Sequence, residues 1–354
     1  MIDLQDSLFL RACRGLPTER TPIWFMRQAG RYMAEYRAIR QQHSMLATIN
    51  SPELAAEITL QPINAFGFDA AIIFSDILPP LQSMGLALEF VKDVGPVIHN
   101  PLTTTYQIDL LATPPAEASM GGTLDAIKLV SAELGPRGVP LIGFCGAPFT
   151  LASYAVEGGG SKNYERTKAL MYSEPAAWAR LMNKLVTVMA DYLIKQAAAG
   201  ASALQIFDSW AGLALSRYDY DRYVKPYNSK LIQMVQGRAR VPVIYFSTGT
   251  ATYLDSIAEM GADVVGVDWR IGLGEARERV GWDRPVMGNL DPVALLAPWR
   301  ELRFRIDQVL AEAGEQPGHI FNLGHGIFKN TPVDNVRRAV EYVQAQTVRS
   351  REVA

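Results

Sequence analysis

The sequence predicts an α/β protein whose core is a single (β/α)8 barrel of the TIM type, somewhat distorted and preceded by an N-terminal extension. Short apolar runs alternate with helical patterns along the chain, and strand–helix alternation of this kind implies a parallel sheet. About eight such units favour a closed barrel over the alternative, a doubly wound open sheet. No linker, low-complexity tract or shift in composition divides the 354 residues, so residues 1–354 are expected to form one domain.

Residues 1–65 are the expected N-terminal extension, which would bring an arginine-rich segment to the cleft of the barrel. Seven apolar or β-branched runs are the predicted strands, at residues 68–74, 139–144, 203–207, 241–246, 263–267, 285–287 and 319–322. Two segments compete for the eighth strand, residues 96–98 and residues 86–91. Helical patterns lie between the strands, at residues 123–134, 175–199, 217–237, 250–260, 298–313 and 332–346.

The composition argues against several classes of protein. The formal net charge of −2 provides no general basic field, so nucleic acid is not an expected partner. The chain has no run of about 18 apolar residues, and its first residues have neither the basic start nor the apolar core of a signal peptide. We therefore expect a cytoplasmic protein without a membrane segment.

Residues that commonly bind metals are sparse. Cys13 and Cys145 are too few and too far apart for a disulfide framework or a zinc site. The histidines include no pair at i and i+4, and none lies near a cysteine in a ligand pattern. The pair Gly272 and Gly274 lacks the third glycine of a dinucleotide fingerprint. The sequence thus predicts neither a metal nor an organic cofactor.

The segment 25–32 places Arg27 and Arg31 four residues apart among apolar side chains. If this segment is helical, both guanidiniums lie on one face, where their repulsion costs a few tenths of a kcal/mol. Arg37 and Arg40 follow, and over the whole chain 25 arginines stand against 9 lysines. Since guanidinium binds carboxylates with two parallel hydrogen bonds, the segment indicates an acidic, multi-carboxylate or phosphorylated ligand. The alternative is a solvated basic helix face.

Small or polar residues follow each predicted strand, and in a barrel these positions share the rim where active sites lie. They are Ser75, Asp76, Gly146, Asp208, Ser209, Ser247, Asp268, Asn289 and residues 322–325. Asp76 is bracketed by apolar residues, so it is either a functional carboxylate or the partner of a structural arginine. His325 stands between glycines in a loop, and Tyr154 near the start of a helix is either a site residue or a core aromatic. Ser209 has no glycine elbow or adjacent histidine, so it does not indicate a serine hydrolase.

Five motifs in order give the chain a resemblance to the uroporphyrinogen decarboxylase family, at residues 26–32, 74–78, 143–150, 157–162 and 321–327. The resemblance implies one distorted barrel, a homodimer, and activity in tetrapyrrole (haem and chlorophyll) biosynthesis without cofactor or metal. The implied reaction removes the four acetate carboxyls of uroporphyrinogen III, giving coproporphyrinogen III and four CO2. The implied substrate-binding residues are Arg27, Arg31, Arg40, Asp76, Tyr154, Ser209 and His325, with Phe207 against the macrocycle. One departure is Phe328-Lys329, where the family usually has Leu-Pro.

The implied chemistry agrees with the residue types. An electron-rich pyrrole can supply its own electron sink when a ring α-carbon is protonated, so no cofactor is required. Asp76 would then accept hydrogen bonds from the pyrrole N–H groups and face the ring cation. With it we assign Arg27 and Tyr154 as catalytic. Tyr154 and Ser209 would hold carboxylates of the substrate, and His325 would hydrogen-bond a propionate. The proton donor is left open.

Two other functions stay open at this stage. The first is a corrinoid- or thiol-linked methyltransferase on the same barrel, which requires a zinc site. The second is a tetrapyrrole-binding protein without catalytic activity, which would keep the arginines but not the carboxylate of Asp76.

Overall fold

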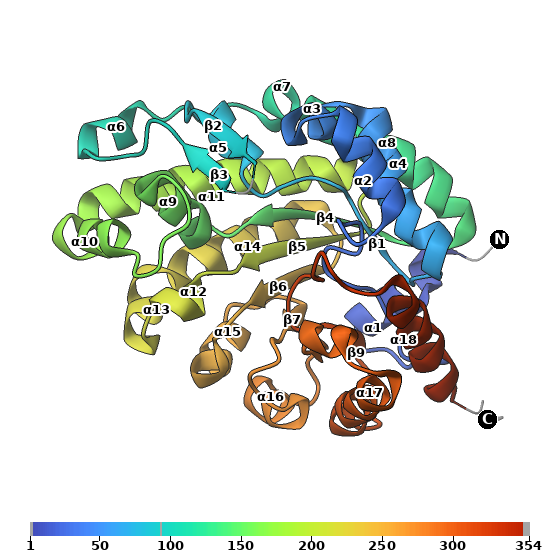
Figure 1. The fold of residues 1–354 in the computed structure, drawn as a ribbon. Helices are drawn as coiled ribbons and strands as arrows, with labels where there is room; N and C mark the ends of the chain where they lie inside the picture. Colours follow the sequence, from blue (N-terminus) through green and yellow to red (C-terminus); the bar gives the residue numbers. More distant parts are fainter. Residues whose placement is uncertain (1–2, 93, 350–354) are drawn as a thin grey trace.

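The computed structural model describes residues 3–92 and 94–349, and a curled parallel sheet forms its centre (Figure 1). Within these residues the sheet has seven strands, and each pairs in parallel with the next: β1 (Ala71–Ile72), β4 (Leu141–Gly146), β5 (Ala203–Asp208), β6 (Val243–Ser247), β7 (Val264–Gly266), β8 (Val286–Leu290) and β9 (His319–Leu323). Each of the seven predicted runs overlaps one of these strands, which confirms that part of the prediction, although several strands extend one to three residues beyond the predicted run. Every strand residue except Phe207 is buried. A sheet buried on both faces explains why these strands read as continuous apolar runs.

Both candidates for the eighth barrel strand were wrong. Residues 86–91 and 96–98 instead contribute to β2 (Leu88–Val91) and β3 (Gly95–Ile98), which pair with each other in an antiparallel hairpin outside the main sheet. Their residues are mostly only half-buried. Two strands joined by so short a connection can pair directly in an antiparallel hairpin. Parallel pairing of the same two strands would require a long crossover connection between them.

The place between β9 and β1 is taken by a segment from the N-terminal region. Ile23 forms a parallel bridge with Phe321 of β9, and Phe321 N donates to Pro22 O at 2.9 Å. On the other side Asp69 N, just before β1, donates to Ile23 O at 2.9 Å. The regular sheet of the described residues therefore has seven strands, and residues 22–24 lie hydrogen-bonded between its two edges.

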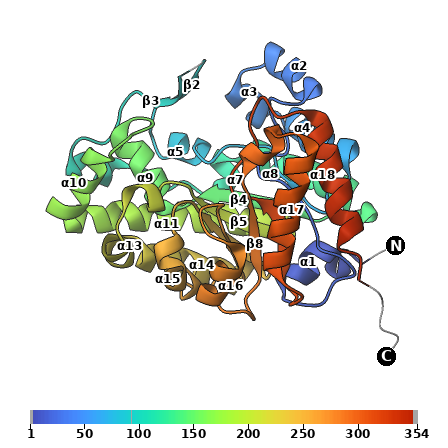
Figure 2. The same cartoon turned by 60° about the horizontal axis from the view of Figure 1, so that its bottom comes forward.

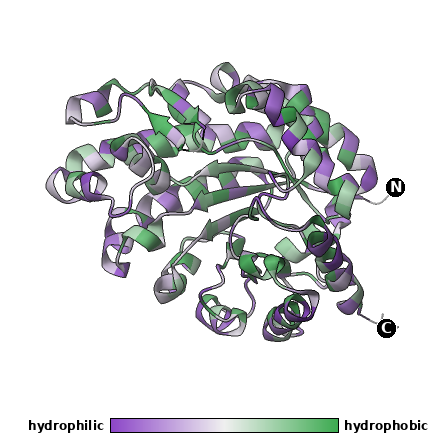
Figure 3. Ribbon diagram, viewed as in Figure 1, coloured by the Kyte–Doolittle hydropathy of each residue, from purple (hydrophilic) through white to green (hydrophobic). Residues whose placement is uncertain are grey.

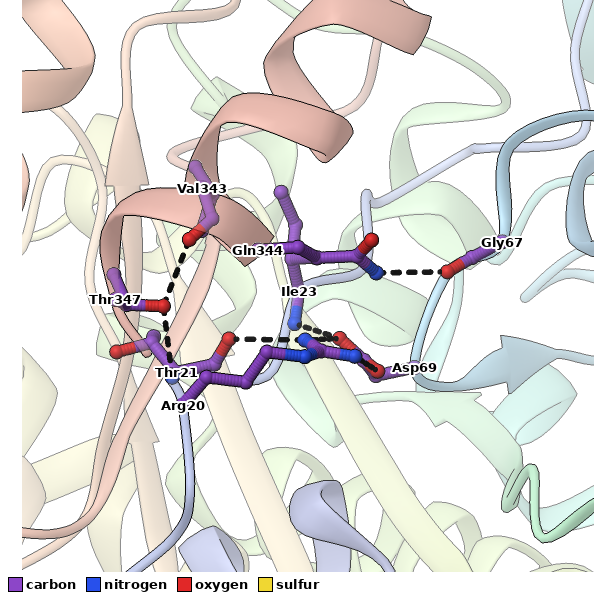
Figure 4. A network of polar contacts seen from close by, with 8 residues as sticks. All are labelled: Arg20, Thr21, Ile23, Gly67, Asp69, Val343, Gln344 and Thr347. Atoms are coloured by element: carbon purple, nitrogen blue, oxygen red, sulfur yellow. Dashed lines mark hydrogen bonds and ion pairs between the residues drawn. The ribbon is translucent and has the colours of Figure 1, made fainter. Parts of the chain in front are cut away.

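A polar clasp holds this segment in place, and Figure 4 shows its residues. Asp69 accepts hydrogen bonds from Nη1 and Nη2 of Arg20, at 2.7 and 2.5 Å, and from the backbone N–H of Ile23 at 2.9 Å. Thr21 N donates to Thr347 Oγ1 at 3.0 Å, and Gln344 Nε2 donates to Gly67 O at 2.9 Å. Side chains from both ends of the chain thus fix the joint between the edges of the sheet.

Helices surround the sheet on its outer side, as Figures 1 and 2 show. The predicted helices are confirmed as α8 (Gly121–Leu134), α11 (Pro175–Ala198), α13 (Arg217–Tyr223), α14 (Lys225–Ala239), α15 (Leu254–Ala258), α17 (Trp299–Ala313) and α18 (Val333–Gln346). The pattern at 217–237 is split at Val224, because Pro226 in the first turn of α14 cannot continue the hydrogen bonding of α13. A short 3-10 turn, η3 (Ala251–Tyr253), precedes α15. Figure 3 shows that the strands of the sheet are mostly hydrophobic, whereas the helices around them carry both hydrophobic and hydrophilic residues.

The remaining elements belong to the N-terminal region and to the loops between strands. They are η1 (Leu4–Asp6), α1 (Leu8–Cys13), α2 (Ala34–Gln42), α3 (Met45–Asn50), α4 (Pro52–Phe66), α5 (Pro79–Ser83), α6 (Thr105–Leu110), α7 (Ala116–Ser119), η2 (Gly135–Arg137), α9 (Pro148–Glu157), α10 (Glu165–Ser173), α12 (Ala211–Ala214), α16 (Leu273–Val280) and η4 (Pro292–Leu296). In Figure 1, β4 and β5 run towards α9 and α12, so these two helices mark the carboxyl end of the sheet. Within residues 3–92 and 94–349, no helix has the length and apolar character needed to cross a membrane.

Candidate active site

The arginine segment is a series of turns, so Arg27 and Arg31 do not share a helix face. Arg27 has a positive φ of 61°, a conformation that interrupts a right-handed helix and is uncommon for residues other than glycine. Its side chain lies directly over Gly326, where an added Cβ would overlap Arg27 Cδ. Gly326 therefore leaves free the space that the Arg27 side chain occupies. The positive φ of Arg27 is a backbone strain of a kind that is typical of functional sites.

Hydrogen bonds to segments in and next to β9 and just before β1 hold this turn in place. Met26 N donates to Asn322 Oδ1 at 3.0 Å, and Ile327 N donates to Met26 O at 3.0 Å. On the β1 side Gln28 Nε2 donates to Ala70 O at 3.1 Å. Arg27 is thereby fixed between the end of β9 and the start of β1, although Met26 and Asn322 are 296 residues apart in the sequence.

Asp76 lies just beyond β1, where Leu78 N donates to its Oδ1 at 3.0 Å. Burial raises the pKa of the Asp76 carboxyl, whereas the N–H of Leu78 and the charge of Arg27 lower it. Burial also raises the pKa of the Tyr154 hydroxyl, with a further increase from Asp76 and an opposing effect of Arg27. Each of these shifts includes the charge of another member of the group, so Arg27, Asp76 and Tyr154 lie close enough to interact electrostatically.

His325 joins this group from the loop after β9. Burial and the charge of Arg27 lower its pKa to about 4, so the imidazole is neutral at pH 7. The ring stands edge-on to Trp269, with 6.3 Å between the centroids. A neutral imidazole has one N–H donor and one acceptor nitrogen. Its N–H can therefore donate a hydrogen bond to a carboxylate.

Arg270 is a further cation next to His325 that sequence reasoning missed. Its guanidinium lies 4.1 Å from the ring centroid of Trp269 and pairs with the buried carboxylate of Asp268. Its charge also lowers the pKa of His325, which places it on the His325 side of the site. Asp268 was noted in the sequence only as a polar strand end, and nothing in the local pattern distinguished Arg270 from other surface arginines.

Aromatic rings on β4, β5 and β6 contact one another near the carboxyl ends of these strands. Phe207 on β5 contacts Phe144 and Phe246 edge-on, at centroid distances of 5.5 and 6.0 Å. Ser209 follows β5 and is half-buried, and its carbonyl accepts a hydrogen bond from Thr248 Oγ1 at 2.6 Å. Trp210, which the sequence analysis did not select, stacks on Tyr154 with 3.9 Å between the ring centroids.

The other two predicted arginines lie elsewhere in the N-terminal region. Arg40 is at the end of α2, where its guanidinium hydrogen-bonds His43 O and Thr48 Oγ1. Arg31 is exposed, and its side chain makes no hydrogen bond or ion pair with any residue in 3–92 or 94–349. Neither charge is among those that shift the pKa of Asp76, Tyr154 or His325, so their role in substrate binding stays a prediction.

The cysteines and histidines do not gather in one place. In the described part of the chain, no three His, Cys, Asp or Glu side chains are grouped as metal ligands would be. Cys145 is buried within β4 as a free thiol, and burial raises its pKa, which disfavours the reactive thiolate.

Comparisons with known proteins agree with this geometry. The family model described as uroporphyrinogen decarboxylase (URO-D) matches residues 4–346. Uroporphyrinogen decarboxylase of Chloroflexus aurantiacus is 54% identical over 340 residues, which is 95% of both chains. That of a Roseiflexus species is 53% identical over 344 residues, or 96% of this chain and 98% of the relative. A solved structure titled as a methyltransferase from Methanosarcina mazei aligns with this chain with a TM-score of 0.82. The alignment covers 98% of this chain and 99% of that one, and the two sequences are 20% identical, so this likeness shows a shared fold. The chain is therefore a member of the uroporphyrinogen decarboxylase family.

Proposed function

We propose that this chain decarboxylates the four acetate groups of uroporphyrinogen III to give coproporphyrinogen III and four CO2, without cofactor or metal. One observation carries the mechanism: the carboxylate of Asp76 interacts electrostatically with Arg27 and Tyr154. Aromatic residues such as Phe207 lie on the neighbouring strands of the sheet. The family membership and the relatives at 54% and 53% identity support the choice of substrate.

Each cycle begins when a pyrrole α-carbon next to the acetate-bearing carbon takes up a proton, which makes the ring a cation. The bond between the acetate methylene and its carboxylate then breaks, CO2 leaves, and the electron pair forms a double bond to the ring. Protonation of the methylene and loss of the ring proton give a methyl group, so each CO2 released consumes one proton. Asp76 accepts hydrogen bonds from the pyrrole N–H groups and faces the ring cation, and Arg27 favours its ionised form.

The other predicted residues bind the eight carboxylates of the substrate. Arg31 and Arg40 bind carboxylates at the edge of the site, and Tyr154 and Ser209 hold those near the reacting carbon. His325 hydrogen-bonds a propionate, and Arg270 beside it adds a second donor group on the same side. Phe207 lies against the face of the macrocycle.

The proposal extends to the form of the molecule. Residues 22–24, which lie within the N-terminal extension of residues 1–65, close the barrel in the place of an eighth strand, so that residues 1–354 make one domain. The enzyme is a cytoplasmic homodimer, as the family resemblance implies. Analytical ultracentrifugation of the purified chain measures the dimer directly, and a monomer at micromolar concentration would overturn that part of the proposal.

One assay tests the reaction. The purified chain is incubated anaerobically with uroporphyrinogen III, with and without a chelator, and the carboxyls of the products are counted. We expect seven-, six-, five- and four-carboxyl products in both samples. A chain that binds uroporphyrinogen without removing carboxyls would be a tetrapyrrole-binding protein. Activity that is lost with chelator and restored by zinc would instead favour the metal-dependent chemistry of the methyltransferases.

A further inference from the structure

Asp208, the last residue of β5, is a fully buried carboxylate that stands in the chain between the predicted site residues Phe207 and Ser209. It accepts hydrogen bonds from Thr150 Oγ1 at 2.7 Å, from Tyr245 OH at 2.7 Å and from Asn228 Nδ2 at 3.1 Å. Within the described residues it forms no ion pair, so three neutral donors replace the water that it has lost. Burying a carboxylate is costly, and a fixed set of donors is what makes it tolerable.

The first of these donors links Asp208 to the site. Thr150 is fully buried in the first turn of α9, and its Oγ1 also accepts a hydrogen bond from Trp210 N at 3.4 Å. Tyr154 lies four residues later on the same face of α9, and its ring stacks on Trp210. The helix that carries Tyr154 and the ring that supports it are therefore both attached to Asp208 through one hydroxyl.

The other two donors have no such connection. Tyr245 lies on β6 and Asn228 on α14, and the Tyr245 hydroxyl further contacts Asn228 Nδ2 at 3.0 Å and Tyr220 OH at 3.1 Å. These contacts face the helices outside the sheet. The Tyr245 hydroxyl thus donates a hydrogen bond to Asp208 but forms none with α9 or with Trp210.

We propose that Asp208 and Thr150 are positioning residues, which hold Tyr154 at the distance from the substrate that the reaction requires. The proposal rests on the role given to Tyr154 in the proposed function. A charge-assisted hydrogen bond is strong and directional, so it fixes α9 against the end of β5 better than apolar packing does. Catalytic groups held in this way need no rearrangement when the reaction occurs.

A matched pair of variants tests this. Thr150→Val and Tyr245→Phe each remove one hydroxyl donor to Asp208 with little change of shape, and Tyr245→Phe breaks the larger number of contacts. We expect Thr150→Val to lower kcat for uroporphyrinogen by about ten- to a hundredfold. Tyr245→Phe should retain kcat, although its melting temperature should fall at least as much as that of Thr150→Val. Thr150→Ser keeps the hydroxyl and should recover most of the activity. If Thr150→Val does not fold, Thr150→Ala is measured instead with the same expectation.

Combining variants shows whether Thr150 acts through Tyr154. If it does, Thr150→Val with Tyr154→Phe should be no slower than Tyr154→Phe alone. Equal losses of kcat in Thr150→Val and Tyr245→Phe, or additive losses in the double variant, would overturn the inference and leave the proposed reaction intact. A wild-type chain that releases no CO2, or a Tyr154→Phe enzyme with normal kcat, would instead remove the function on which the inference rests.

Discussion

At the scale of single residues, the charge of Asp76 is the feature on which the mechanism depends. Asp76→Asn preserves the shape of the side chain but removes the charge that faces the ring cation. We expect kcat to fall by about a hundredfold or more, with little change in substrate binding, and Asp76→Glu to be partly active. Single-turnover rate and melting temperature are measured on the same sample.

The contrary result for Asp76 is equally specific. If Asp76 were only a structural partner of Arg27, the Asn variant would melt at lower temperature while its folded molecules turned over normally. A stable and fast Asp76→Asn enzyme would remove this residue from the mechanism altogether.

Gly326 tests the position of Arg27 independently of its charge. Because an added Cβ would overlap the Arg27 side chain, Gly326→Ala should displace the guanidinium and weaken substrate binding nearly as much as Arg27→Ala does. The loss of a buried carboxylate partner costs roughly 2 to 5 kcal/mol. Gly237→Ala is the control, since a Cβ at that position in α14 meets nothing within 4 Å. Unchanged kcat/KM in Gly326→Ala would show that Arg27 tolerates displacement.

At the scale of elements, the joint between β9 and β1 depends on Arg20 and Asp69. The side chains of Arg20 and Asp69 are 22% and 11% exposed, so their forked pair is shielded from solvent far better than an ordinary surface pair. Arg20→Ala should lower the free energy of unfolding by about 1 to 3 kcal/mol and speed hydrogen exchange at Trp24 N and Asp69 N.

Arg305 offers a matched control for this clasp. It pairs with Glu301 one turn away on α17, where both side chains are about half exposed at 53% and 49%. Pairs of that kind contribute roughly 0 to 1 kcal/mol, so Arg305→Ala should change stability little. If both arginine variants behaved alike in denaturant titration, the clasp would not be what holds the joint.

At the scale of the whole molecule, acid should destabilise the fold through the buried His319 and the partly buried His325. Burial is the main cause that lowers the pKa of His319 and of His325 to about 4, from an ordinary value of 6.5. The unfolded chain therefore binds protons between pH 6.5 and 4 that the folded chain does not. Their contribution to stability is complete above pH 6.5 and is lost as the pH falls towards 4.

Denaturant titrations across this window measure the effect. For His319, which is 5% exposed, the contribution is up to about 3 kcal/mol. His319→Gln should show a shallower decrease of the unfolding free energy between pH 6.5 and 4 than the wild type. Parallel curves for the two proteins would mean that His319 is not among the groups responsible.

The sequence by itself determined the α/β class with its parallel sheet, the stretches in which the seven strands lie and most helices. It also placed Asp76 and His325 among the polar strand ends expected at one rim, and their roles stay predictions. It could do so because periodicity, continuous apolar runs and polar strand ends are local features that a parallel sheet brings to one edge. The family resemblance, resting on short motifs, was likewise contained in the chain and is confirmed by the comparisons.

Only the tertiary structure decided how the sheet edges meet and what holds the site in place. The hairpin of β2 and β3 took the segments expected for the eighth strand, because local antiparallel pairing needs no crossover. The left-handed turn at Arg27, its space over Gly326 and the support of Tyr154 by Trp210 depend on contacts between distant parts of the chain. A local pattern carries no information about such contacts, since packing, not propensity, selects them.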